Sequence, residues 1–158
     1  MSGPPELRPA RAGEAGRLSA IAHAAKAALG YPPPLIAAWH EELTIEPELL
    51  LRHTVWALEC EGAVQGFFSI HAAGSGAVLA HLWVDPPAQR RGFGSMLLRK
   101  ALQLASVSRL AWLEVDAEPS AEAFYLRHGL HKVGEIAAPI PGDEKRVRPQ
   151  LRYTVPRG

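Results

Sequence analysis

The sequence has little of several features that mark specialised classes of protein. It contains one cysteine, Cys60, which excludes an intramolecular disulfide and favours a reducing compartment. Its formal net charge is +1 at pH 7, so the charge balance predicts no binding to nucleic acid or to a membrane surface. No apolar run approaches the ~18 residues of a membrane span, and the first residues lack the apolar segment of a secretory signal. We therefore expect a cytoplasmic protein.

Signatures of metal and nucleophile sites are also lacking. The seven histidines and Cys60 never fall at the spacing of a metal-ligand set. His128 and His131 come nearest, but this pair crosses from a helix end into a strand. No nucleophile elbow indicates a Ser/His/Asp triad. The sequence therefore predicts no metal.

What is present is the composition and periodicity of a single globular domain over residues 1–158. The chain is 47% hydrophobic and 21% charged, and it is long enough to bury a core. Apolar spacings of three and four residues predict helices over 14–29, 35–43, 94–106 and 119–128, with a further turn in 44–51. Strand patterns cover 54–60, 64–71, 77–84, 110–115, 131–136 and 151–155, with 6–8 as a short additional strand. This order predicts an α/β fold with a mixed sheet of six or seven strands and about four helices.

One stretch, 83–98, organises the chain. A strand ends there, two prolines break it, and a helix begins around Gly92 and Gly94. Glycines at a helix start leave backbone N–H groups uncovered at the positive end of the helix dipole. Arg90 and Arg91 add two positive charges. We expect a phosphate or pyrophosphate to bind here, although a glycine-containing turn without a ligand would have a similar sequence.

Two phosphate-binding loops are excluded by what this stretch lacks. A dinucleotide loop requires a third glycine where the chain has Leu97. A P-loop requires Gly-Lys-Ser/Thr after a longer glycine-framed loop, and the sequence has none. The segment Gln89-Arg90-Arg91-Gly92-Phe93-Gly94 instead resembles the Gln/Arg-x-x-Gly-x-Gly/Ala pyrophosphate loop of the GNAT superfamily of N-acetyltransferases.

A second segment, 118–130, strengthens this resemblance. It is similar to the Asp-Pro-Asn-Ala-x-x-Phe-Tyr-x-x-x-Gly pattern of small bacterial GNAT proteins, and the residues in register are Ala121, Phe124, Tyr125, Gly129 and Leu130. Glu118 and Ser120 stand in place of the Asp and Asn of that pattern. The resemblance implies the GNAT fold, in which the sheet is splayed between its fourth and fifth strands.

The resemblance also implies acetyl-CoA as the co-substrate. The pantetheine arm would pair with the backbone at the end of the strand 77–84 like an added half-strand, and the pyrophosphate would bind loop amides. The implied cofactor-binding residues are Leu82, Trp83, Val84, Gln89, Arg90, Arg91, Gly92, Phe93, Gly94, Ser95, Ser120 and Phe124. Core packing also explains the side chains of Leu82 and Val84.

The implied chemistry is acyl transfer from a thioester to an amine. Tyr125 is the candidate proton donor to the departing thiolate, with a buried packing role as the alternative. Glu114 is the candidate base, and a strand carboxylate without a catalytic role is the alternative. Positions where other family members carry a base hold Val78 and Ala80. A water chain that ends on a carboxylate within 114–118 would then be needed.

Residues of the acceptor side have two interpretations each. Tyr31 and Trp39 are either the core of a helix pair or walls of the acceptor site. The charged run 143–148 is either a solvated loop or a contact to the 3′-phosphate or the substrate. Strand alternation places His81 on the face opposite Leu82, which makes His81 structural if the Leu82 face is the site.

These observations predict an N-acetyltransferase that acts on a primary amine of a small molecule. Direct transfer in a ternary complex is favoured because Cys60 lies far from both motifs in the sequence. A protein N-terminal or lysine acetyltransferase, and an acyl-CoA-binding regulator without catalysis, are the alternatives. The expected partners are acetyl-CoA and an amine acceptor, without nucleic acid or membrane, and a homodimer is left open.

Overall fold

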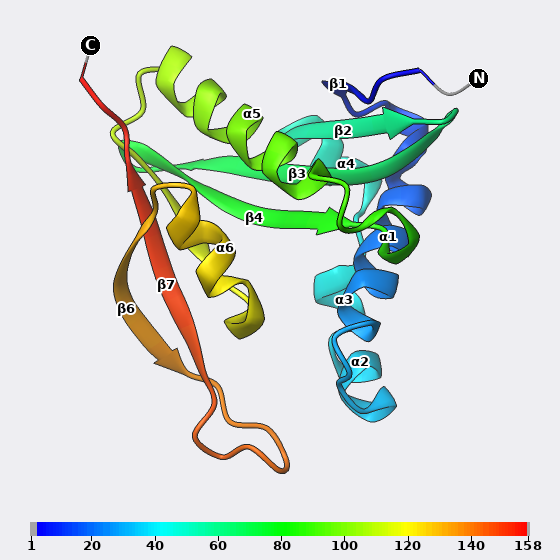
Figure 1. The fold of residues 1–158 in the computed structure, drawn as a ribbon, viewed down its shortest axis with the longest axis vertical. Helices are drawn as coiled ribbons and strands as arrows, with labels where there is room; N and C mark the ends of the chain where they lie inside the picture. The colour runs from blue at the N-terminus through cyan, green and yellow to red at the C-terminus, as the bar shows by residue number, and fades with distance from the viewer. Residues whose placement is uncertain (1–2, 158) are drawn as a thin grey trace. The chain divides into compact units, whose positions relative to one another are not determined.

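The fold is a seven-stranded mixed sheet with helices, as a computed structural model of residues 3–157 describes it (Figure 1). The strands are β1 (Glu6–Pro9), β2 (Thr54–Cys60), β3 (Ala63–Ala73), β4 (Gly76–Val84), β5 (Trp112–Asp116), β6 (His131–Ala137) and β7 (Val147–Thr154). The α-helices are α1 (Ala15–Ala27), α2 (Pro33–Ala38), α3 (His40–Leu43), α4 (Pro47–Arg52), α5 (Phe93–Val107) and α6 (Glu122–Arg127). Three short 3₁₀ turns are η1 (Ala12–Glu14), η2 (Pro86–Ala88) and η3 (Pro119–Ala121).

The sheet confirms the predicted α/β class and the predicted splay. Its strand order is β1-β2-β3-β4-β5-β7-β6, and β4 and β5 pair in parallel. Registered partners of β4 and β5 are Ala77 with Leu113 and Val78 with Glu114, at the beginning of both strands. The flanking pairs β1–β2, β2–β3, β5–β7 and β6–β7 are antiparallel. The parallel strands follow from the long crossover through α5.

The helices differ from the expectation in number and length. The stretch 35–43 forms two short helices, α2 and α3, because the backbone of Trp39 leaves helical geometry at φ −92° and ψ 9°. The further turn predicted in 44–51 is a separate helix, α4, that begins at Pro47, where proline is well tolerated. Residues 3–157 therefore contain six α-helices where the sequence predicts about four. None of the helices in residues 3–157 is long and apolar enough to cross a bilayer.

The chain divides into two compact units. The first comprises residues up to Ile70 together with His81–Leu98, and the second comprises His71–Ala80 and the residues from Arg99 onward. The expectation of a single domain over 1–158 stays a prediction.

The core of the first unit lies between α1 and the strands β2 and β3. The predicted apolar face of α1 is buried at Leu18, Ile21 and Ala22, which pack with Val55, Ala57 and Phe67 of the strands. Trp39 and Trp83 are partly buried against this cluster. The β2–β3 hairpin closes through a two-residue turn, Glu61–Gly62, in which both φ angles are positive, as this class of turn requires.

The second unit buries apolar residues of β5, α6 and β7. Leu113, Val115, Tyr125, Leu130 and Leu151 are all at most 6% exposed. β7 pairs with both β5 and β6, and its register with β5 places Arg152 opposite Glu114 and Gln150 opposite Asp116. This register determines the surroundings of the predicted catalytic base.

Candidate active site

The loop between β4 and α5 has the geometry of an anion-binding site. β4 ends at Val84, η2 follows at the two prolines, and α5 begins at Phe93. Arg90 and Gly92 both have positive φ, +66° and +81°. A non-glycine residue in this region is uncommon and costs of order 1 kcal/mol, so the conformation at Arg90 is held by its surroundings. The loop therefore has a defined turn rather than a loose one.

The first turn of α5 supplies uncovered backbone donors. The N–H of Met96 donates to the carbonyl of Gly92 at 3.1 Å, so the amides of Phe93, Gly94 and Ser95 precede the point where intrahelical bonding begins. A Cβ atom at Gly92 would meet no atom within 4 Å, so the space beside these amides is open. The dipole of the 15-residue helix adds positive potential there. A phosphate fits this donor set.

Side chains from distant parts of the chain anchor both ends of the loop. The Gln89 side-chain amide donates to the Val84 carbonyl at 3.0 Å and so closes the loop onto the strand end. Arg17 of α1 donates to Asp85 at 2.8 Å and to the Val64 carbonyl at 2.8 and 3.0 Å. The Asp85 N–H donates to the Gln65 carbonyl at 2.8 Å. No local sequence signal predicts Arg17 or Gln65, because both lie far from the loop along the chain.

The side chains of the two loop arginines lie in different surroundings. Arg90 is exposed, and Arg91 bonds to Glu61 and lies over the Phe93 ring, 4.7 Å from its centroid. The predicted positive charge is therefore partly compensated at Arg91. Phe93 itself is 3% exposed and packs as core, so only its backbone faces a ligand.

The residues predicted beside the pantetheine arm end β4. Leu82, Trp83 and Val84 are all half-buried. β3 approaches them closely at Gly66, where a Cβ atom would lie 2.9 Å from the Trp83 carbonyl oxygen and 3.0 Å from a Leu97 methyl group. The sheet has no room for a side chain at this point, which fixes the path of the strand end.

His81 forms a locked pair with Trp83. The Trp83 indole N–H donates to His81 Nδ1 at 3.1 Å. Because an indole nitrogen is only a donor, Nδ1 must carry the lone pair, and the ring proton of the neutral imidazole resides on Nε2. Burial, and secondly the nearby charge of His53, lowers the pKa of His81 to about 4. His81 is therefore a neutral hydrogen-bond donor at Nε2 near pH 7 and not a proton acceptor there.

This pair predicts an acid-sensitive contribution to folding stability. The pKa of about 4 in the folded chain lies below the ordinary value of about 6.5, so the unfolded chain binds more protons between these values. Stability should fall as the pH drops from 6.5 to 4, by on the order of 2 kcal/mol between pH 7 and pH 5. Urea unfolding at both pH values measures it. The variant His81→Gln keeps an acceptor for Trp83 without titrating, and an equal loss in this variant would contradict the assignment.

In the second unit, Tyr125 is buried on α6 and carries a protonated hydroxyl. Burial raises the pKa of Tyr125 well above its ordinary value. Its ring contacts Phe124 edge-on, with centroids 5.2 Å apart, and Phe124 in turn contacts His128. The hydroxyl makes no hydrogen bond to any residue in the described range 3–157. Gly129, with φ +91°, ends the helix, and Leu130 N–H bonds back to the Tyr125 carbonyl at 3.2 Å.

The carboxylates of 114–118 each form an ion pair with an arginine. Glu114 accepts two hydrogen bonds from its register partner Arg152, one of them at 2.8 Å from Nε. Asp116 accepts from Arg148 at 2.9 Å and from the Gln150 amide at 3.0 Å. Glu118 lies 3.9 Å from an Arg146 nitrogen. The charge of the predicted base Glu114 is thus neutralised by an arginine, and its role stays a prediction.

The remaining predicted residues have simpler surroundings. Ser120 is exposed in η3. Tyr31 and Trp39 meet edge-on at 5.0 Å between centroids, and the ammonium of Lys26 lies 5.0 and 4.4 Å from the two ring centroids. The ammonium group of Lys26 therefore contacts both of these aromatic rings. Within the described residues, no group of His, Cys, Asp or Glu side chains is arranged to hold a metal.

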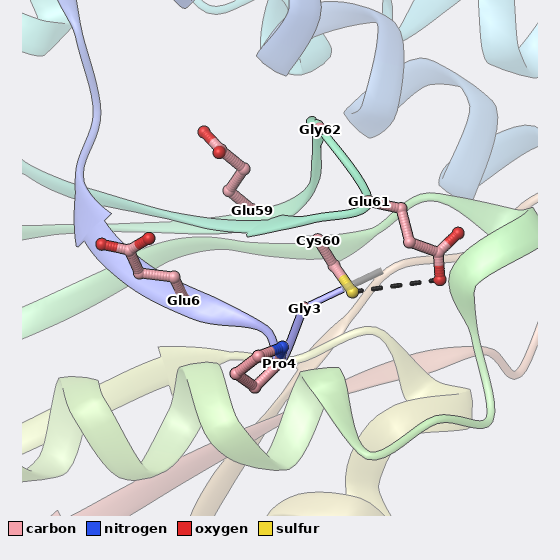
Figure 2. A pocket seen from close by; sticks show the side chains of 7 residues that line it. All are labelled: Gly3, Pro4, Glu6, Glu59, Cys60, Glu61 and Gly62. Atoms are coloured by element: carbon pink, nitrogen blue, oxygen red, sulfur yellow. Dashed lines mark hydrogen bonds between the residues drawn. The ribbon is translucent and has the colours of Figure 1, made fainter. Parts of the chain in front are cut away.

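A cavity of about 480 Å³ lies beside the β2–β3 turn (Figure 2). Its lining combines the N-terminal segment with the hairpin end and consists of Gly3, Pro4, Glu6, Glu59, Cys60, Glu61 and Gly62. The side chains of Cys60 and Glu61 point toward one another in Figure 2, with the thiol 4.0 Å from Glu61 Oε1, while Glu59 points away from Glu61.

Comparison with known proteins agrees with this geometry. Residues 52–131, half of the chain, match the model of the acetyltransferase (GNAT) domain, so the protein is an acyltransferase by class. The chain belongs to the GNAT acetyltransferase family.

Individual relatives span different shares of the chain. A mycothiol acetyltransferase of Mycolicibacterium vanbaalenii is 41% identical over 86 residues, which cover 54% of this chain and 28% of that protein. A GCN5-related N-acetyltransferase structure from Rhodopseudomonas palustris superposes with a TM-score of 0.79 over 98% of both chains, at 22% identity. The PaiA N-acetyltransferase of Thermoplasma acidophilum, in complex with coenzyme A, gives a TM-score of 0.78 over 96% of this chain and 99% of that one, at 15% identity. The two structures establish likeness of fold.

Proposed function

We propose that this protein transfers the acetyl group of acetyl-CoA to the primary amine of a small molecule, directly and within a ternary complex. The observation that carries the proposal is the row of open amides at the start of α5, beside Gly92, in a chain of the acetyltransferase family. The name of the mycothiol acetyltransferase relative supports a small molecule rather than a protein as the acceptor.

The chain's own residues supply three parts of this chemistry. The amides of Arg91 to Ser95 would hold the pyrophosphate, whereas the Gln89 N–H already donates to the Pro86 carbonyl at 3.2 Å. The backbone of Leu82–Val84 would pair with the pantetheine arm, with Ser120 and Phe124 as further contacts. The protonated Tyr125 hydroxyl would donate to the sulfur as the carbon–sulfur bond breaks.

Removal of the amine proton is the remaining step. A primary amine with a pKa near ~10.4 is mostly protonated at neutral pH and must lose a proton before it attacks. Val78 and Ala80 carry no base, and the carboxylates of 114–118 are paired with arginines. Water linked to one of these carboxylates, with Glu114 as our candidate, would therefore take the proton.

Direct transfer is supported by the state of the single thiol. Cys60 is 3% exposed, and the sequence contains no other cysteine to carry the acetyl group. A lone reduced cysteine also suits the cytoplasm as the compartment.

Acetyl-CoA binding tests the donor part of the proposal. At 100 times its Kd, acetyl-CoA should stabilise the fold by about 2.7 kcal/mol, which raises the melting temperature by several degrees for a chain of this size. Gly92→Asp places a carboxylate among the amides and should abolish the shift, whereas Gly30→Asp, which is also at positive φ (+91°) and in open space, adds the same charge after α1 and should retain it. A wild-type melting temperature unchanged in millimolar acetyl-CoA would refute the proposal.

Thiol release from acetyl-CoA tests the acceptor part. We expect release to depend on a small primary amine from a panel that also contains peptides with free N-termini and lysines. Thiol release with peptides alone would identify a protein, and not a small molecule, as the acceptor. Acetyl-CoA binding without any thiol release would indicate a regulator without catalysis.

A further inference from the structure

The guanidinium of Arg91 is held in place by the hydrogen bonds of one of its own nitrogens and by contact with one aromatic ring. Nη2 donates to Glu61 Oε1 at 2.8 Å and to the Cys60 sulfur at 3.6 Å, while the planar group lies over Phe93. Phe93 is itself buried and begins α5. The side chain is therefore fixed relative to the helix start on one side and to the β2–β3 turn on the other.

The other two nitrogens of this guanidinium are available. Nε and Nη1 make no hydrogen bond to the described residues 3–157, and the side chain is 42% exposed. An arginine carries five N–H donors in a rigid fork that matches the geometry of a phosphate. Arg91 thus presents free donors from the same loop as the open amides of α5.

Glu61 is held where it is by the hairpin. It adopts φ +58° in the tight turn with Gly62, a conformation that asparagine, aspartate or glycine adopts more readily than glutamate. The Gln65 side chain braces the same turn by donating to the Cys60 carbonyl at 3.0 Å, and the Gln65 carbonyl accepts the Asp85 N–H at the start of the loop. Glutamate is therefore an unfavourable residue for this turn. The hairpin nevertheless contacts the β4–α5 loop twice, through Glu61 with Arg91 and through Gln65 with Asp85. Both observations indicate a role for the Glu61 side chain.

We propose that Glu61 is a positioning residue that fixes the Arg91 guanidinium so that its free nitrogens bind a phosphate group of the acetyl donor. The inference rests on the proposed function, since it requires a phosphate-bearing donor at this loop. The Cys60 sulfur and the Phe93 ring complete the surroundings of the guanidinium, and neither side chain would contact the phosphate.

If Glu61 acted only through its negative charge, its removal would change the affinity for the donor in the opposite direction. The two roles can therefore be distinguished by experiment. A carboxylate beside an anion site repels the anion, so its removal should tighten donor binding if Glu61 does no more than add negative charge. If Glu61 positions Arg91, its removal should weaken binding because the guanidinium loses its orientation. The change Glu61→Gln keeps the size of the side chain and removes its charge, so the charge-assisted hydrogen bond to Arg91 becomes a weaker neutral one that orients the guanidinium less firmly.

The experiment is calorimetric titration of the full chain with acetyl-CoA. We expect Arg91→Gln to raise Kd by about tenfold, since a hydrogen bond to a charged group is lost. Glu61→Gln should raise Kd by about three- to fivefold, and the double variant should bind no more weakly than Arg91→Gln. In steady state, the KM for acetyl-CoA should rise while kcat at saturation stays unchanged. Glu59→Gln, which alters a carboxylate bonded to Arg8 instead, is the matched control and should leave Kd unchanged.

Several outcomes would overturn the inference. An unchanged or lower Kd for Glu61→Gln refutes the positioning role. The role is also refuted if Glu61→Gln raises Kd by the same factor in the Arg91→Gln variant as in the wild type. Absence of acetyl-CoA binding by the wild type refutes the proposed function and this inference together, so the two failures are distinguishable. Titration with CoA lacking the 3′-phosphate identifies the group bound: loss of the Arg91 effect assigns the 3′-phosphate, and its persistence assigns the pyrophosphate.

Discussion

Tyr125→Phe is expected to lower turnover by about 100-fold or more while leaving the affinity for acetyl-CoA unchanged. Positioned proton donors contribute about 10²–10⁴-fold to a rate, and the substitution removes only the hydroxyl that would protonate the departing thiolate. The ring, which provides the burial and the edge-on contact with Phe124, is retained. Steady-state kinetics and acetyl-CoA titration of the same preparation measure the two quantities.

The burial of Tyr125 adds a pH criterion to this prediction. Because burial raises the pKa of the phenol, its proton stays in place well above neutral pH, and ionisation of Tyr125 should not reduce wild-type turnover between pH 7 and pH 10. An exposed tyrosine acting as the donor would begin to lose activity near its ordinary pKa of about 10.

Tyr153→Phe is the matched control for Tyr125→Phe. Tyr153 belongs to β7 in the same unit, opposite Leu113, and its hydroxyl has no place in the proposed chemistry. We expect this variant to retain wild-type turnover within about twofold, since it keeps the ring and removes only a hydroxyl that takes no part in the proposed reaction. Equal turnover of Tyr125→Phe and wild type would assign Tyr125 to packing alone.

The parts of the fold that could be predicted are those encoded locally. The apolar spacing of α1, the two strands that flank the Glu61–Gly62 turn and the helix start next to Gly92 each lie within one short segment, and the structure has them where the sequence predicts them. The break at Trp39 lies within an apolar stripe that continues through α2 and α3, so periodicity alone gave no reason to divide it.

The surroundings of the candidate site could not be predicted because they depend on register and long-range contacts. Glu114 is followed 38 residues later by Arg152, and only the pairing of β5 with β7 places them opposite one another. Arg17 and Asp85 are 68 residues apart, and Arg91 and Glu61 are 30 apart. The sequence names the loop that would bind the donor, whereas the fold supplies the side chains that hold the loop in shape.

Gly76→Ala is expected to destabilise the protein strongly, although it adds one methyl group. A Cβ atom at Gly76 would lie 2.1–2.5 Å from three ring atoms of Trp112, because β4 and β5 run parallel here and the indole lies across the glycine. The indole would have to move from this position and lose its contact with the Arg152 guanidinium, which lies 5.4 Å from the centroid of the Trp112 ring. Displacing a packed aromatic ring costs about 3 kcal/mol, which lowers the melting temperature by roughly 6–12 °C.

Two further variants separate this clash from a general effect of adding a methyl group. Gly16→Ala adds the same methyl in α1, where a Cβ atom meets nothing within 4 Å, and should stabilise the fold by up to about 1 kcal/mol through helix propensity. In a Trp112→Ala background the clash disappears, so Gly76→Ala should then cost little, and the two substitutions should be non-additive. Because the registered pairs of β4 and β5 lie immediately beyond Gly76, loss of the indole should weaken the pairing from which the splay begins. A Gly76→Ala protein that melts at the wild-type temperature would show that Trp112 has an equally stable second position.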